Sequence, residues 1–225
     1  MFLLTSCASI VPVSNYFETA PTLGKGKAEG SISGSQYRNM NYGRNELTNQ
    51  NIGFAAGYGL TDRIDLKIRY EKADIRHPVE NGLTGSEYFS IVPKLSLVPE
   101  RLSVFMNGFQ YRMRYRFDAG KESNTLTGFG THFTYTQPFW ENRVSASMTF
   151  GGDATIGDSG GGLLGDSWGG RSDGSLFFMT QLGAAFSSDL NRWSVRPEVG
   201  ITGNGDSRFW NYGISFHWKF SLGKE

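Results

Sequence analysis

The stretch Ile64-Asp65-Leu66-Lys67-Ile68-Arg69-Tyr70-Glu71 alternates strictly between apolar and charged residues. Successive side chains of a β-strand point to opposite faces, so this stretch predicts a strand with one apolar face and one charged face. The stretch from Trp210 to Leu222 repeats the alternation over seven apolar positions, which is longer than most strands of soluble proteins. The fold is therefore expected to consist of long strands with two different faces.

The same alternation recurs in ten segments between Lys25 and Leu222, separated by turn residues. Short connections are expected at 60–63, 98–101, 137–142 and 187–191, and longer loops at 36–49, 73–87, 118–124, 151–174 and 203–208. This alternation of connection lengths is typical of barrels with short periplasmic turns and long extracellular loops. We expect a closed antiparallel transmembrane β-barrel of about ten strands, with eight and twelve as bounds.

Composition narrows the class of protein. The 225 residues include 30 glycines and 14% aromatics, with 22 basic against 21 acidic residues. The balanced charge argues against a nucleic-acid partner, and without a run of about 18 apolar residues a helical membrane span is excluded. A mean hydropathy of −0.36 is compatible with a membrane barrel, because half of each strand would face a polar interior.

Alternation alone does not say which face is outside, since a soluble barrel would place its apolar face inward. Aromatic residues near the strand ends favour the membrane alternative, because aromatic rings gather at both bilayer interfaces. The expected girdle is Trp140, Trp193, Trp218 and Phe220 with Phe139 toward the short turns, and Trp210 with Tyr70, Tyr115, Phe117 and Phe209 toward the long loops.

From about Gly24 to Leu222 the pattern resembles the superfamily of small Gram-negative outer-membrane β-barrel proteins. The final strand, with Trp218-Lys219-Phe220, is similar to the assembly signal of that superfamily, although here the chain continues from Ser221 to Glu225. The resemblance implies a location in the bacterial outer membrane, with outer-membrane lipids and lipopolysaccharide as surroundings and other outer-membrane proteins as candidate partners.

The N-terminal Leu4-Thr5-Ser6-Cys7 resembles a bacterial lipobox, in which the cysteine is lipidated. The alternative is an ordinary cysteine near the end of the chain. We expect residues 1–6 to be the remainder of a signal peptide whose true start lies upstream, and 7–23 a lipid-anchored periplasmic tether. Residues 24–222 then form the barrel and 223–225 a tail, with both termini in the periplasm.

Charged residues on the polar faces are expected to gather in the lumen. The predicted cluster is Lys67, Arg69, Glu71, Arg112, Arg114, Arg116, Arg196, Glu198 and Lys219. One interpretation is a plug of ion pairs across a narrow bore, because buried charges must be paired or hydrated. The other is a constricted anion path led by Arg112, Arg114 and Arg116. For Arg112 to face the lumen, Phe109, Tyr111, Met113, Tyr115 and Phe117 must face outward.

The sequence contains no recognisable catalytic constellation. His77 precedes a proline in an expected loop, and His132 and His217 lie within expected strands without a local nucleophile or metal pattern. No metal and no cofactor is expected. The loop from Gly151 to Gly174 has neither phosphate-loop nor EF-hand spacing, and its Leu163, Leu164 and Trp168 have no assigned role.

We therefore expect a non-enzymatic outer-membrane lipoprotein barrel, a structural or accessory component of an envelope complex. The alternatives are a narrow channel for small anions, and a lipid-modifying or proteolytic barrel enzyme around His132 or His217.

Overall fold

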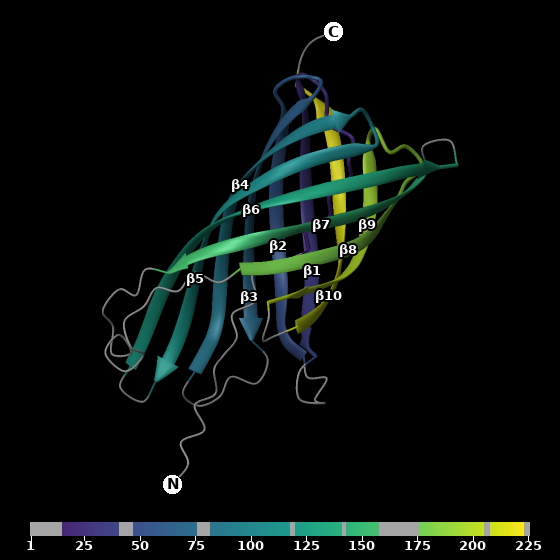
Figure 1. Cartoon of the computed structure of the whole chain (residues 1–225). Helices are drawn as coiled ribbons and strands as arrows, with labels where there is room; N and C mark the ends of the chain where they lie inside the picture. Colours follow the sequence, from purple (N-terminus) through teal and green to yellow (C-terminus); the bar gives the residue numbers. More distant parts are fainter. Residues whose placement is uncertain are drawn as a thin grey trace.

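The computed structural model describes residues 15–40, 47–75, 82–117, 120–140, 143–157, 176–204 and 208–222. These residues form ten strands: β1 (Lys27–Asn39), β2 (Leu47–Gly59), β3 (Ile64–Ile75), β4 (Gly82–Val98), β5 (Leu102–Phe117), β6 (Gly120–Phe139), β7 (Val144–Gly157), β8 (Leu176–Phe186), β9 (Trp193–Gly203) and β10 (Arg208–Ser221). Each strand pairs antiparallel with its neighbours in the chain, and β1 pairs with β10 to close the sheet. The predicted closed ten-stranded antiparallel barrel is confirmed (Figure 1).

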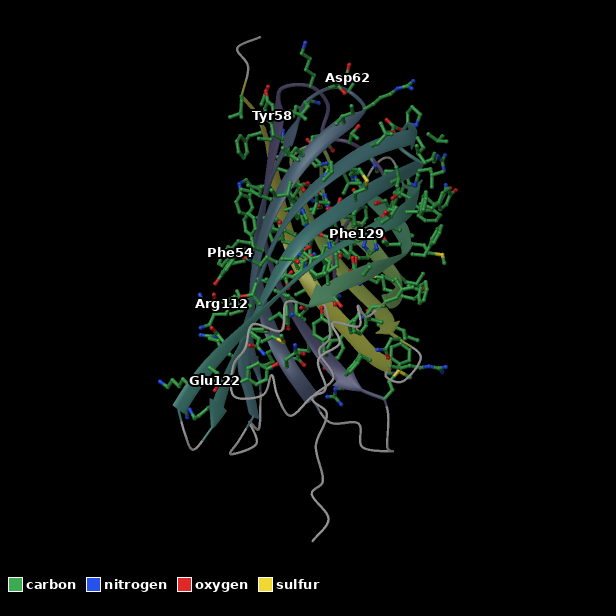
Figure 2. The ribbon with its side chains drawn as sticks, turned by 60° about the vertical axis from the view of Figure 1, so that its left-hand side comes forward. Phe54, Tyr58, Asp62, Arg112, Glu122 and Phe129 are labelled. Carbon is green, nitrogen blue, oxygen red and sulfur yellow. The ribbon has the colours of Figure 1, made fainter. Side chains whose placement is uncertain are left out.

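Both faces of the barrel wall follow from the alternation. On β3, Leu66, Ile68 and Tyr70 are about 40–50% exposed on the outside. On the same strand, Asp65, Arg69 and Glu71 are buried in the interior. Strands β2 and β10 repeat this arrangement, and Figure 2 shows Phe54 and Tyr58 of β2 on the outer surface. The apolar face is therefore outside and the polar face inside, the reverse of a soluble barrel.

Strand β5 corrects the prediction for Arg112, Arg114 and Arg116. Phe109, Tyr111 and Met113 are buried in the interior, where they pack with Tyr88 of β4. The three arginines therefore point outward, and Figure 2 shows Arg112 directed away from the barrel. The reason lies in the first half of the strand: Ser103, Phe105 and Asn107 are buried, and an unbroken strand keeps that alternation to its end.

The second correction concerns the predicted periplasmic tether, 7–23. Of its described part, 15–23, residues Asn15 to Ala20 are buried inside the barrel. The segment runs from the middle of the lumen toward the end with the short turns, where the chain turns into β1. Gly24 and Gly26 make this turn with φ of +85° and +76°, values that glycine adopts without steric cost.

Several strands extend into segments expected to be loops. Strand β6 begins at Gly120, so most of 118–124 is strand, and β7 continues to Gly157. The end of the barrel with the connections 60–63, 99–101, 140–143 and 187–192 is called the short-turn end below, and the other the loop end. Cys7, His77, Leu163, Leu164 and Trp168 lie outside the described residues.

The aromatic side chains follow the predicted girdle only in part. Trp140, Trp210, Trp218 and Phe220 are exposed on the outer surface, and Trp193 is half-buried beside Phe216, its ring centroid 6.2 Å from that of Phe216. Phe209 is instead fully buried in the interior against Tyr37, and Tyr115 packs on the interior cluster around Tyr111. The short-turn group thus lies as expected, whereas the loop-end group is mixed.

Candidate functional site: the plugged lumen

The interior of the barrel is organised around Glu18, a residue of the N-terminal segment. Its carboxylate forms an ion pair with Lys67 of β3, and its Oε2 lies 3.4 Å from Nζ of Lys94 on β4. All three side chains are largely buried. Opposite charges placed together in this way offset the cost of removing each from water.

Lys67 links Glu18 to a second acid on the barrel wall. Its Nζ lies 3.4 Å from Glu29 of β1, and Glu29 accepts a hydrogen bond of 3.0 Å from Arg196 of β9. Nδ1 of His217 lies 3.1 Å from the other oxygen of Glu29. Through Glu18 and Glu29, one connected network thus joins β1, β3, β4, β9 and β10.

The backbone of residues 15–24 is bound by wall side chains and not by strand pairing. The amide of Phe17 donates to Glu198 (2.9 Å), and Arg196 donates to the carbonyl of Phe17 (3.0 Å). The amide of Ala20 donates to Thr136 (2.7 Å). Buried backbone groups need such partners, so the polar wall and the inserted segment satisfy each other. We call residues 15–24 the plug segment.

Deeper in the lumen, Tyr16 anchors the plug segment to a second polar group. Its hydroxyl donates to Asp153 (3.2 Å) and accepts from Asn107 (2.7 Å). Nε2 of His132 lies 3.0 Å from Asp153, and the ring of His132 stacks on Phe105. Beside this group Arg69 donates to the carbonyl of Asn15 and to Glu71.

The lumen is closely filled around these contacts. Among the described residues, cavities of about 20 and 10 Å³ border the plug segment, and each has room for about one water molecule. Charges on the described inner wall are also nearly balanced. The basic residues are Lys67, Arg69, Lys94, Arg196 and Lys219, and the acids are Glu29, Asp65, Glu71, Asp153 and Glu198 with the half-buried Glu122 of β6, whose strand partner Tyr115 faces inward. The arrangement suits a sealed interior better than an open path.

Six members of the predicted lumen cluster do lie inside, namely Lys67, Arg69, Glu71, Arg196, Glu198 and Lys219. The sequence did not predict the inward position of Asp153 or the inserted plug segment. Asp153 was assigned to a loop, although it continues the inward positions Ser145 and Thr149 of β7. Lys94 follows the inward alternation of β4, but nothing in the sequence indicates that it binds Glu18.

The histidines that carried the enzyme alternative are buried among fixed partners. Ser215 Oγ lies 2.7 Å from Nε2 of His217, and Glu29 stands on the other side of the ring. This order of hydroxyl, imidazole and carboxylate is that of a nucleophile with its base. Here, however, Glu29 is bound to Arg196 and Lys67, and Ser215 is only 2% exposed. His217 borders a cavity of about 10 Å³ that is also lined by Tyr16, Phe17 and Glu18 of the plug segment, which leaves no room for a substrate beside the ring.

Among the described residues, no group of three or more His, Cys, Asp or Glu side chains has the geometry of a metal site. Nor does that part of the chain contain a helix long and apolar enough to cross a membrane.

Neither a protein-family model nor a curated protein matches the sequence. The fold is similar to those of solved outer-membrane proteins. An outer-membrane channel from Pseudomonas putida F1 aligns over 94% of this chain and 100% of its own, with a TM-score of 0.47 and 10% identity. The outer-membrane protease OmpT from Escherichia coli aligns over 87% and 96%, with a TM-score of 0.42 and 10% identity.

A third solved structure is Ail, the attachment invasion locus protein of Yersinia pestis. It aligns over 87% of this chain and 99% of its own, with a TM-score of 0.39 and 12% identity. At these identities the likeness concerns the fold alone. These solved structures differ in the activities their names give, so any function must be argued from this chain's own residues.

Proposed function

We propose that the protein is an integral outer-membrane β-barrel with a sealed lumen, serving as a structural or accessory component of the envelope. The observation that carries this proposal is the pairing of an apolar outer wall with an interior filled by the plug segment. Exposed side chains such as Ile52, Phe178 and Ile214 would be costly in water but stable in hydrocarbon.

The same proposal includes a lipid on Cys7 and periplasmic short turns. The lipobox-like sequence Leu4 to Cys7 supports the first. The short connections at the short-turn end support the periplasmic location of these turns, since periplasmic turns of such barrels are short. Strand β1 begins and strand β10 ends at this end, where Lys27 pairs with Ser221.

A sealed interior argues for a non-catalytic and non-conducting role. The plug segment contacts both polar groups of the lumen, one through Glu18 and the other through Tyr16. The anion path proposed from Arg112, Arg114 and Arg116 loses its basis, because these side chains face outward.

The test uses the full chain purified in mild detergent. An intact membrane barrel is expected to shift its mobility on cold SDS gels upon heating, and to give no steady conductance after insertion into planar bilayers. Solubility without detergent and without the Cys7 lipid would overturn the membrane assignment. Steady openings of the unmodified protein would instead support the second candidate, a narrow channel, and remove the sealed one.

A further inference from the structure

The three arginines on the outside of β5 form a surface that the sealed-barrel function does not use. Arg112, Arg114 and Arg116 occupy alternate positions of one strand face, so their side chains stand about 7 Å apart along the strand. Lys72 and Lys121 lie on the same outer surface, and among the described residues the acids there are Glu87 and Asp74. In this part of the chain five basic groups therefore face two acids.

In the described part of the chain, few acidic side chains pair with these three arginines. Arg114 lies 3.8 Å from Glu87, in a half-exposed pair. Among the described residues, no ion pair connects Arg112 or Arg116 to an acid, although every buried arginine of the lumen has a carboxylate partner. Guanidinium groups kept available on a surface are suited to bidentate hydrogen bonds with phosphate.

The face of β5 that leads to the arginines is a gap in the apolar wall. Gly108 pairs with Ile91 of β4 on one side and with Phe129 of β6 on the other. Both neighbours are exposed, Phe129 by 60%, whereas a Cβ atom added at Gly108 would meet nothing within 4 Å. The strand thus presents an apolar recess bordered by two large side chains, and the basic groups begin four residues further along the same face.

The position of this surface in the barrel defines what can occupy it. Register places Tyr70, Phe89 and Gln110 in one row and Lys72, Glu87 and Arg112 in the next. The basic row therefore begins where the aromatic row ends, toward the loop end, and Figure 2 shows Arg112 and Phe129 on the outer wall. In the proposed orientation this is the headgroup level of the outer leaflet.

We propose that this surface binds a phosphorylated acyl glycolipid of the outer leaflet, of the lipid A type found in lipopolysaccharide. Arg112, Arg114 and Arg116 hold its phosphates, and an acyl chain lies over Gly108 between Ile91 and Phe129. An acidic protein would use the charges but not the apolar recess. The closed sheet also leaves no free strand edge for a protein partner to extend. The inference rests on the proposed membrane function and its orientation.

The experiment separates the charge from the recess. Full-length protein, purified in mild detergent, is titrated with bisphosphorylated lipid A, with its dephosphorylated form, and with inorganic phosphate as competitor. The triple variant R112Q/R114Q/R116Q is compared with R63Q/R143Q/R192Q, which removes the same charge from exposed positions at the short-turn end. Gly108→Leu is compared with Gly34→Leu, a second outward glycine whose added Cβ would meet only one backbone atom, at 3.9 Å.

We expect the β5 triple variant to bind bisphosphorylated lipid A about tenfold or more weakly, because each charge-assisted hydrogen bond is worth about a factor of ten. Gly108→Leu is expected to weaken binding, while both control variants bind as the unmodified protein does. Equal binding by the β5 triple and its control overturns the proposal, as does equal binding of the dephosphorylated lipid. Displacement by inorganic phosphate at matched concentration also overturns it, by revealing an anion site without a lipid component.

The heat-dependent gel shift tests the membrane assignment independently of lipid binding. A β5 variant that still shifts but has lost the lipid supports the proposal. If the unmodified protein shifts and the variants bind equally, only the lipid surface is wrong. If the unmodified protein shows no shift, the proposed membrane function itself has failed.

Discussion

Replacing Glu18 by Gln is the most direct perturbation of the plug segment. It removes the carboxylate that Lys67 and Lys94 share in the lumen. Breaking a buried ion pair by removing one partner typically costs about 3–5 kcal/mol. Lys67 retains Glu29 at 3.4 Å, and Lys94 retains the carbonyls of Thr19 and Pro21 at 2.5 and 2.8 Å. These remaining partners lower the expected cost to about 2–3 kcal/mol.

A cost of this size shifts the balance between inserted and displaced plug segments by a factor of about 30–150. Because the plug segment lies inside the barrel, its displacement is expected to appear as brief openings in planar-bilayer recordings. The ratio of open to closed time in Glu18→Gln should rise by that factor relative to the unmodified protein. A variant lacking residues 15–24 marks the fully open level.

The matched control is Glu100→Gln, which removes the same charge from an exposed turn. If Glu18→Gln and Glu100→Gln give indistinguishable traces while the deletion variant conducts, Glu18 does not hold the plug segment in place. If the heat-shifting deletion variant stays closed, the wall side chains seal the lumen on their own, and the reasoning from the plug segment is refuted.

Three further results are expected. Asp153→Ala deprives Tyr16 and His132 of their shared acceptor and should lower the free energy of unfolding in urea by about 2–4 kcal/mol; a loss no larger than that of the exposed control Asp74→Ala would contradict the role of Asp153. Cys7→Ser should abolish incorporation of an alkyne-labelled fatty acid while the heat shift persists, and continued labelling would place the lipid elsewhere. The unmodified protein should leave fluorescent phospholipids intact, and hydrolysis that disappears in Ser215→Ala would revive the enzyme alternative.

The barrel could be predicted because the outward or inward direction of most side chains depends only on the alternation of residue types within one strand. In β3 and β10 apolar residues alternate strictly with polar ones. The few residues around Ile68 or Trp218 are therefore enough to predict that these side chains point outward. Strand count and closure then follow from repetition of the pattern and from the need to satisfy every edge.

Strand β5 shows where a local pattern misleads. Its second half alternates aromatic and basic residues, and an aromatic residue suits either a lipid face or a packed interior. Face assignment there depends on the first half, where Ser103 and Asn107 are small or polar and Val104 and Met106 are apolar. Reading the strand from Leu102 onward would have placed Arg112 outside.

The plug segment was not predictable in the same way, because no periodicity marks a chain that lies in a lumen. Tyr16, Phe17 and Glu18 lie among residues typical of a linker. Their buried position depends on partners more than 45 positions away in the chain, such as Lys67 and Asp153. Lys67 and Lys94 place two ammonium groups on neighbouring strands, and Glu18 of the plug segment supplies the carboxylate that both contact. On the described inner wall five basic residues face six acids, so this wall is net acidic by one charge. Glu18 adds a second negative charge, which a displaced plug segment removes. A lumen opened by loss of the plug segment is therefore expected to show little preference for anions, and strong anion selectivity of the deletion variant would contradict this count.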